Sequence, residues 1–203
     1  MKKKSTAAAL LLAAVLLIPA CTEQRAVQVH IGEQTQESRP AEEAVYEGML
    51  SELVANGGKN TYDTLNVATY ITKVEDTYFI ADCYHNQIIY NQNLTDPLSQ
   101  WRVLTNEVHY AHTIASDGVM LLADDTENNR LLAFQRTDDG YVHTQTLENI
   151  GMRPHYVQYD AKNQVFMAWS SITGEMYLIK KAEHPDARGI YPLYVDKILK
   201  IDE

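Results

Sequence analysis

A hairpin pattern that occurs three times is the sequence feature that most constrains the fold of this chain. Each copy has an aliphatic run, a polar turn and a second aliphatic run, and its apolar residues alternate with the period of two that is typical of strands. The three turns contain Asn86, Asn129 and Gly174, which lie 43 and 45 positions apart. Asn and Gly tolerate the positive φ angle that a tight turn demands. The pattern therefore predicts a repeated β-structure.

Each copy predicts four strands in the same order. The expected strands are residues 70–74, 78–81, 87–91 and 101–105 in the first copy, 112–116, 119–123, 130–135 and 141–147 in the second, and 155–159, 164–169, 175–180 and 193–201 in the third. Four antiparallel strands every 43 to 45 residues are typical of the blade of a β-propeller. We therefore predict an all-β fold with three four-stranded blades, over residues 66–107, 108–150 and 151–203.

The hairpin also resembles the repeat of a known family. In the first two copies, an aliphatic residue, Ala and Asp precede a turn that ends in Asn, and Gln or Arg and an aliphatic pair follow it. This pattern resembles NHL-type repeats, and the resemblance implies a propeller that in that family mostly has six blades. The third copy departs from it, because Ser170 stands where Asp82 and Asp125 stand in the others. The resemblance covers residues 66–201 and implies an architecture, not an activity.

The chain is short for a six-bladed ring. Six blades of about 44 residues need roughly 260 residues, whereas 138 residues follow residue 65. Two explanations are open: the chain is a truncated product, or two copies close a ring as a homodimer. An open arc leaves strand-rich faces unpaired, which natural proteins avoid. The strand-like end at residues 200–203 favours the truncated product.

The first twenty residues have the features of a signal peptide. A basic start, Lys2 to Lys4, precedes an apolar run over residues 7–18, which is too short to span a bilayer comfortably. The run ends in Leu17-Ile18-Pro19-Ala20-Cys21, which resembles the lipobox of bacterial lipoproteins. The resemblance implies cleavage before Cys21, acylation of this residue with chains such as palmitate, and anchoring at the extracytoplasmic face of a bacterial membrane. The alternative is an ordinary secretory signal with a cysteine near its cleavage site.

Two further segments precede the repeats. Residues 21–40 are rich in Glu, Gln, Thr and Ser and lack a sustained apolar face, so we expect a flexible tether. Residues 41–65 are expected to contain one short helix and a linker. The helix is predicted from five apolar residues that fall on one helical face: Val45, Met49, Leu50, Leu53 and Val54.

Charge and cysteine content exclude some classes of function. The formal net charge is −10, and loss of residues 1–20 removes three Lys and no acid, which leaves −13. Nucleic acid is not an expected partner, because its phosphates are bound by Lys and Arg. Anionic headgroups repel such a protein, so its attachment to a membrane depends on acyl chains at Cys21. The other cysteine, Cys83, follows an apolar run and is predicted to be a buried, inert thiol.

Two histidines are the strongest candidates for a functional site. His112 and His155 each lie five positions before a turn acid, Asp117 and Asp160, and therefore occupy equivalent positions at the start of adjacent first strands. The same count places Ile71 there in the first copy. First strands line the central channel of propellers, where some six-bladed enzymes, including the lactonase-like and amidating-lyase-like groups, bind ligands or metals. The alternative role for both histidines is structural, as hydrogen-bonding groups at blade junctions.

Other polar residues around these turns have simpler interpretations. Arg153 could hold a carboxylate or phosphate next to His155, or be an ordinary surface residue. His109 precedes His112 with the H-x-x-H spacing, but strand residues three apart point to opposite sides, so this pair is not expected to chelate a metal. The acid-rich segment 124–129 lacks the central Gly and distal Glu of an EF-hand loop. We expect Asp82 and Asp125 to hydrogen-bond turn amides.

The sequence leaves two functions open. No G-x-S-x-G, H-E-x-x-H, phosphate-loop or dinucleotide-binding motif is present. The first hypothesis is a lipid-anchored platform that binds a protein, peptide or glycan and needs no cofactor. The alternative is a fragment of a metal-dependent lyase or hydrolase with His112 and His155 as channel ligands.

Overall fold

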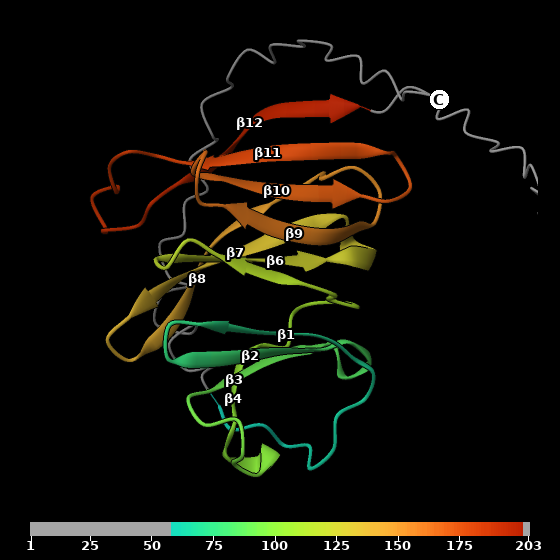
Figure 1. The fold of residues 1–203 in the computed structure, drawn as a ribbon, viewed down its shortest axis with the longest axis vertical. Helices are drawn as coiled ribbons and strands as arrows, with labels where there is room; N and C mark the ends of the chain where they lie inside the picture. Colours follow the sequence, from blue (N-terminus) through green and yellow to red (C-terminus); the bar gives the residue numbers. More distant parts are fainter. Residues whose placement is uncertain (1–57, 201–203) are drawn as a thin grey trace, which may run out of the picture.

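The computed structural model describes residues 58–200, which form three four-stranded antiparallel sheets (Figure 1). The first sheet contains β1 (Ala68–Val74), β2 (Thr77–Asp82), β3 (Gln87–Asn91) and β4 (Arg102–Thr105). The second contains β5 (Ile114–Ser116), β6 (Met120–Asp125), β7 (Arg130–Thr137) and β8 (Gly140–Leu147). The third contains β9 (Pro154–Asp160), β10 (Val165–Ser170), β11 (Glu175–Lys181) and β12 (Leu193–Lys200). The prediction of an all-β fold with three four-stranded blades is confirmed.

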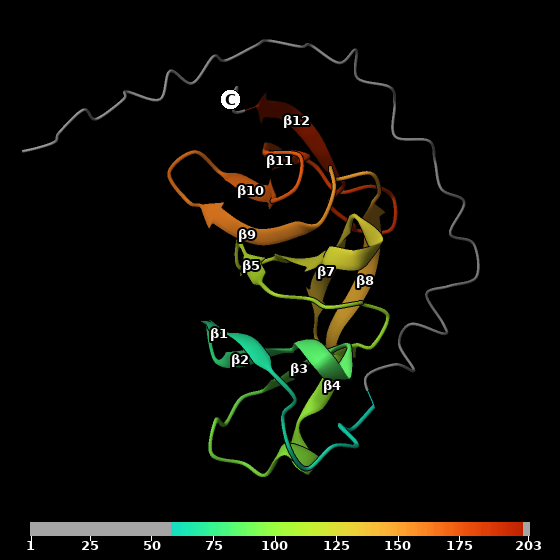
Figure 2. The same ribbon diagram turned by 90° about the vertical axis from the view of Figure 1, so that its right-hand side faces the viewer.

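The sheets follow one another as blades. Within each sheet the strands are hydrogen-bonded in chain order, as a meander. Figures 1 and 2 show the three sheets stacked along the long axis of the molecule. The first strands of neighbouring sheets are in contact, β1 with β5 and β5 with β9. These three strands are therefore the inner strands, and the loops that lead into them lie at one end of the sheets.

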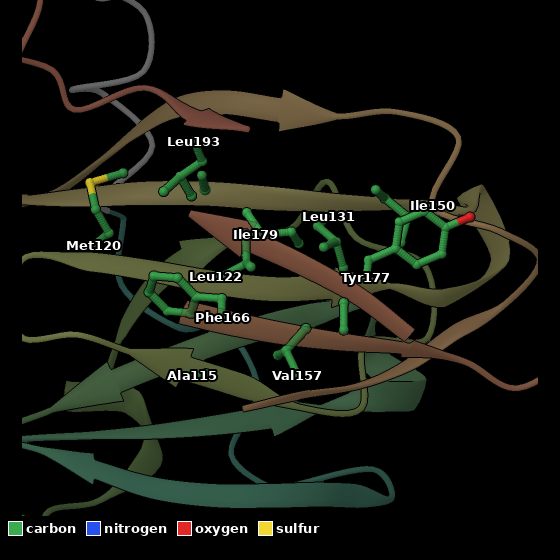
Figure 3. Packing of buried hydrophobic residues seen from close by; sticks show 12 residues of the cluster. Ala115, Met120, Leu122, Leu131, Ile150, Val157, Phe166, Tyr177, Ile179 and Leu193 are labelled. Atoms are coloured by element: carbon green, nitrogen blue, oxygen red, sulfur yellow. The ribbon is translucent and has the colours of Figure 1, made fainter. Parts of the chain in front are cut away.

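Alternating apolar residues fill the space between neighbouring sheets. From β6, Leu121 and Ala123 pack toward the first sheet, against residues such as Phe79. Met120 and Leu122 belong instead to the cluster between the second and third sheets, which Figure 3 shows. Strand side chains alternate between the two faces, so a blade between two others is apolar on both. This is why β6 reads as an almost continuous apolar run.

The first sheet has an apolar cluster on its other face as well. Ile80 and Ile89 pack there with Trp101, which is 1% exposed. Trp101 follows the 3₁₀ helix η3 (Leu98–Gln100), and its carbonyl accepts a hydrogen bond from the Asn60 amide. Trp101 is therefore a core residue.

The hairpin turns repeat in conformation as well as in sequence. Short 3₁₀ helices, η2 (Cys83–His85) and η4 (Thr126–Asn128), precede Asn86 and Asn129, whose φ angles are 53° and 56°. Gly174 has a φ of 63° in the third turn. All three residues are in the left-handed region, where Asn and Gly are the preferred residues.

The second blade differs from the sequence-based prediction at its first strand. β5 begins at Ile114, not at His112. The backbone amides of His112 and Thr113 donate to the Asp124 side chain, at 2.9 and 2.5 Å, instead of joining the strand ladder. The buried carboxylate therefore replaces two rungs of the expected strand.

The prediction that places Ile71 at the position of His112 is wrong. Three residues with positive φ, Val67, Tyr110 and Arg153, recur at intervals of 43 positions and mark the repeat in the backbone. By this criterion Thr69 is the equivalent of His112 and His155. The prediction places Ile71 by counting back five positions from Asp76. The equivalent turn residues are instead Glu75 and Gly118, both with positive φ, so the residue that corresponds to Asp117 in the first blade is Val74.

The remaining predictions concern cysteine and the N-terminal segments. Cys83 is a free, fully buried thiol, and burial followed by the nearby carboxylates of Asp124 and Asp82 raises its pKa to about 11. Because the Cys83 thiol is buried and its raised pKa keeps it protonated, it is expected to be unreactive. The lipobox with Cys21, the tether and the apolar face of the predicted helix, Val45 to Val54, lie outside the described residues. Between residues 58 and 200, no helix has the length and apolar character needed to span a membrane.

Candidate functional site

A repeated side-chain clamp positions the loops at the inner end of the blades. Asp82 Oδ1 accepts the backbone amide of Asn66, and Asp125 Oδ1 accepts that of His109, each at 2.7 Å. The prediction that these aspartates bind turn amides is wrong for backbone amides, because the two that they bind belong to the loops that lead into the inner strands. It is confirmed for one side-chain amide, that of the turn residue Asn128, which donates to Asp125. Both carboxylates are fully buried, so the loops are held by hydrogen bonds that water does not weaken.

The third blade uses a serine for the same purpose. Ser170 Oγ accepts the Met152 amide at 2.8 Å and donates to the Met152 carbonyl at 2.7 Å. Asn66, His109 and Met152 are 43 positions apart, so Ser170 holds the equivalent amide. The third copy therefore retains the clamp, but a hydroxyl group replaces the carboxylate as the acceptor.

The turn asparagines connect each blade to the next. Asn86 Oδ1 accepts the amide of Tyr110 at 3.2 Å, and Asn129 Oδ1 accepts the amide of Arg153 at 2.8 Å. Tyr110 and Arg153 have φ angles of 57° and 58°. These bonds fix two residues that rarely adopt this conformation. Because His112 and His155 follow Tyr110 and Arg153 by two positions, these bonds also determine where the two histidines lie.

The structure brings His112 and His155 together. Their ring centroids are 3.9 Å apart, with 36° between the ring planes. His112 is half-buried and His155 is exposed. Next to them, Arg153 Nη2 lies 2.5 Å from Glu127 Oε1. We call His112, Glu127, Arg153 and His155, together with Tyr110 two positions before His112 in the chain, the histidine cluster.

The electrostatics of the histidine cluster favour a neutral His112. Burial, followed by the charges of His155 and Arg153, lowers the pKa of His112 from 6.5 to about 4. Burial disfavours the charged form of the His112 imidazole, and positive charge close to the ring disfavours it further. At neutral pH His112 therefore offers one N–H donor and one nitrogen acceptor.

We expect the stability of the blades to fall as the pH drops from 6.5 toward 4. In this range the unfolded chain takes up a proton at His112 while the folded chain does not, so protonation favours unfolding. The expected loss is about 1–2 kcal/mol after allowance for solvent screening. Urea unfolding at about pH 7.5 and 4.5 should show a smaller loss in His112→Gln than in the wild type. An unchanged loss in His112→Gln, equal to that of the control His184→Gln, would contradict this assignment.

Several residues near the cluster do not follow from sequence reasoning. The Thr69 hydroxyl lies 3.2 Å from the carbonyl oxygens of Ala111 and His112, so the first blade is joined to the second at the repeat position of the histidines. The Tyr84 ring lies 5.3 Å from that of Tyr110. Tyr84 is 56% exposed, so the cluster continues as an accessible aromatic surface. The interval of 43 positions in backbone conformation identifies Thr69, but the residue types alone do not.

Few further side chains that could bind a metal lie beside the candidate metal ligands His112 and His155. Between residues 58 and 200, no group of three or more His, Cys, Asp or Glu side chains is arranged to hold a metal ion. His109 and His112 lie on a loop, and the His109 ring is next to Tyr110, at 4.6 Å. In the acid-rich turn, Asp124 and Asp125 are fully buried and accept hydrogen bonds from protein groups. The side chains of the histidine cluster can instead bind polar and aromatic groups of a ligand by hydrogen bonding and stacking.

Comparisons with known proteins give similarity of fold at most. No family model matches the chain, and no curated protein matches its sequence. A periplasmic gluconolactonase from Pseudomonas aeruginosa is similar in structure, with 9% identity, a TM-score of 0.49 and coverage of 72% of this chain and 40% of that one. A putative 6-phosphogluconolactonase from Bacteroides fragilis has 13% identity, a TM-score of 0.47 and coverage of 72% and 40%.

A protein from Lactobacillus plantarum has 19% identity, a TM-score of 0.45 and coverage of 62% of this chain and 39% of that one. The chain thus spans about two fifths of the length of these solved structures. Because the TM-scores are below 0.5, the fold assignment rests on the three sheets of the chain itself.

Proposed function

We propose that this chain is a lipid-anchored extracytoplasmic protein whose NHL-type blades bind a protein, peptide or glycan through the histidine cluster. The observation that carries the proposal is the contact between His112 and His155, which come from different blades. A core does not need two imidazoles at the accessible end of its inner strands. With Tyr110 and Arg153 nearby, they present donors, acceptors and aromatic faces together, as ligand-binding surfaces do.

The geometry supports binding better than catalysis by a metal. A catalytic zinc takes three protein ligands and keeps one position open. The histidine cluster has two imidazoles, and its single carboxylate, Glu127, is paired with Arg153. Binding requires only the hydrogen-bonding groups and surfaces that these residues already present.

Glycan and peptide arrays test the binding proposal. We expect purified protein to give reproducible signals on one class of probe, and His112→Ala/His155→Ala to lose them by about tenfold or more, which corresponds to about 1.4 kcal/mol. His155→Ala alone is a second variant that keeps the fold, because its ring is exposed. His184→Ala is the matched control, since His184 is also exposed but lies in the loop before β12.

Two results would contradict binding through the histidine cluster. One is array binding by the double variant that equals the wild type. The other is a stoichiometric metal in the purified full-length protein that disappears in the double variant, because that result supports the metal-dependent enzyme. Metal content is measured on the same preparations as the arrays.

Replacement of Cys21 tests the anchor. Acyl chains contribute about 0.8 kcal/mol per buried CH₂, so several chains hold a protein on a membrane durably. The protein itself is acidic and is not attracted to anionic lipid. Cys21→Ser should therefore move the protein from the membrane fraction of the bacterial host to the soluble fraction and abolish labelling with palmitate. Retention of Cys21→Ser in the membrane contradicts the lipobox interpretation.

A further inference from the structure

A pocket lies beside the first blade, between the segment 58–62 and the turn after β2. It has a volume of about 400 Å³. Its lining residues come from this segment, from the η2 turn and from the end of the first sheet: Gly58, Lys59, Thr61, Tyr62, His85, Asn86, Gln87, Val103 and Asn106. We call it the His85 pocket. Its lining is mostly polar, and its volume is in the range of pockets that hold small molecules.

The His85 imidazole has a fixed orientation in this pocket. Its Nδ1 lies 2.7 Å from Oδ2 of Asp82, which is fully buried. The ring is also stacked on Tyr62, with centroids 3.7 Å apart and 7° between the planes. The carboxylate accepts, so Nδ1 carries the proton, and in that tautomer Nε2 is the acceptor of the ring. Among the described residues, Nε2 has no hydrogen-bond partner.

The second blade shows that the clamp does not require an imidazole. Asn128, 43 positions after His85, donates from Nδ2 to both oxygens of Asp125, at 3.0 and 2.9 Å. Arg130 is likewise the equivalent of Gln87, and both donate to the clamp carboxylate. An amide is therefore sufficient at this position. His85 adds two features that Asn lacks, a second ring nitrogen and a ring face that stacks on Tyr62, and its ring lines the pocket.

The pocket also holds a positive charge without an opposing one. Lys59 is exposed and forms no ion pair within residues 58–200. None of the nine lining residues is an acid, although the chain as a whole carries a net charge of −10. The clamp carboxylate of Asp82 lies behind the His85 ring and is fully buried. A ligand with a negative group therefore meets an ammonium group here and no exposed carboxylate of the lining.

We propose that the His85 pocket binds a small hydroxylated carboxylate of the uronic acid class. The ligand carboxylate pairs with Lys59, and a ring hydroxyl donates to Nε2 of His85. The Nδ2 group of Asn86, whose Oδ1 accepts the Tyr110 amide, can donate to a remaining hydroxyl, and the Asn106 amide can donate or accept. This site is separate from the histidine cluster, and the two proposals can fail independently.

Titration with glucuronate, and with glucose as the neutral counterpart, tests the proposal. At about pH 7.5, we expect saturable shifts of the His85 ring resonances with glucuronate. Glucose should bind about tenfold more weakly, because it lacks the carboxylate. Lys59→Gln should reduce glucuronate binding to the level of glucose.

His85→Asn separates a binding role from a structural one. It keeps an amide donor to Asp82, as Asn128 provides to Asp125, but loses the ring that stacks on Tyr62. We therefore expect a folded variant with a lower melting temperature and with glucuronate binding weakened by about tenfold or more. Glucuronate binding equal to that of the wild type in His85→Asn or in Lys59→Gln would overturn the proposal. The same holds if glucuronate leaves the His85 resonances of the wild type unmoved. A His85→Asn variant that does not fold would contradict the equivalence of the two clamps, and Lys59→Gln then still tests the ligand.

Discussion

Asp124→Ala is expected to lower the free energy of unfolding by about 3–5 kcal/mol, a large part of the 5–15 kcal/mol of a typical domain. The fully buried Asp124 side chain accepts the amides of His112 and Thr113 and the hydroxyl of Thr113, the last at 2.8 Å. Alanine leaves these donors without partners and without water. Urea unfolding followed by circular dichroism measures the loss.

The effect should extend to the third blade. Thr113 Oγ1, which donates to Asp124, also accepts the amide of Val157 in β9, at 2.8 Å. Asp124→Asn retains one acceptor oxygen and should lose less than the alanine variant. Asp138→Ala is the control, because Asp138 is exposed in the turn between β7 and β8. A loss of less than about 1 kcal/mol in Asp124→Ala would show that these donors find other partners.

Gly151→Ala should also cost about 3–5 kcal/mol, from two separate causes. Gly151 has a φ of 58°, where a side chain is strained. Its Cβ would collide with Ser170 Oγ and would lie 2.6 Å from Thr173 Oγ1. The Ser170 hydroxyl would have to move and would release the Met152 amide that it holds. Thermal and urea unfolding of the purified variant measure the loss.

Gly174→Ala provides the matched control for Gly151→Ala. Gly174 has a similar φ of 63°, but no atom lies within 4 Å of the position of a Cβ. Its substitution should therefore cost only the backbone strain, about 1–2 kcal/mol. Equal losses in the two variants would mean that the contact with Ser170 contributes nothing.

The fold is predictable from the sequence where local residues determine the backbone. Asn86, Asn129 and Gly174 identify the turns, and the alternating apolar runs on either side identify the strands. The start of β5 is not predictable in this way. The carboxylate that captures the amides of His112 and Thr113 comes from Asp124, which is more than ten residues away.

The candidate site is predictable only in part. Counting from Asp117 and Asp160 is enough to find that His112 and His155 occupy equivalent positions, but the same count fails for the first blade. Acids recur near these turns but not at one repeat position, because Asp117 corresponds to Val74, whereas the positive φ of Val67, Tyr110 and Arg153 marks the repeat without ambiguity. Val, Tyr and Arg give no sign of this conformation in the sequence, because neighbouring groups impose it.

The ion pair between Arg153 and Glu127 illustrates the same limit. Arg153 was a candidate from its place beside His155, but its partner belongs to the turn of the preceding blade. The clamp of His85 by Asp82 is likewise hidden, because the sequence pattern shows the aspartate and not the group that it orients. Contacts between blades depend on the packing of whole sheets, which no short motif encodes.

The central claim is that two neighbouring blades bind one ligand at the histidine cluster. Its most direct test is an NMR titration of the histidine ring resonances with the array-selected ligand, using His184 as the internal reference. We expect the resonances of His112 and His155 to shift together with one dissociation constant, while those of His184 stay in place, because the two rings are 3.9 Å apart. Saturable binding that leaves the resonances of both rings unchanged would contradict the claim.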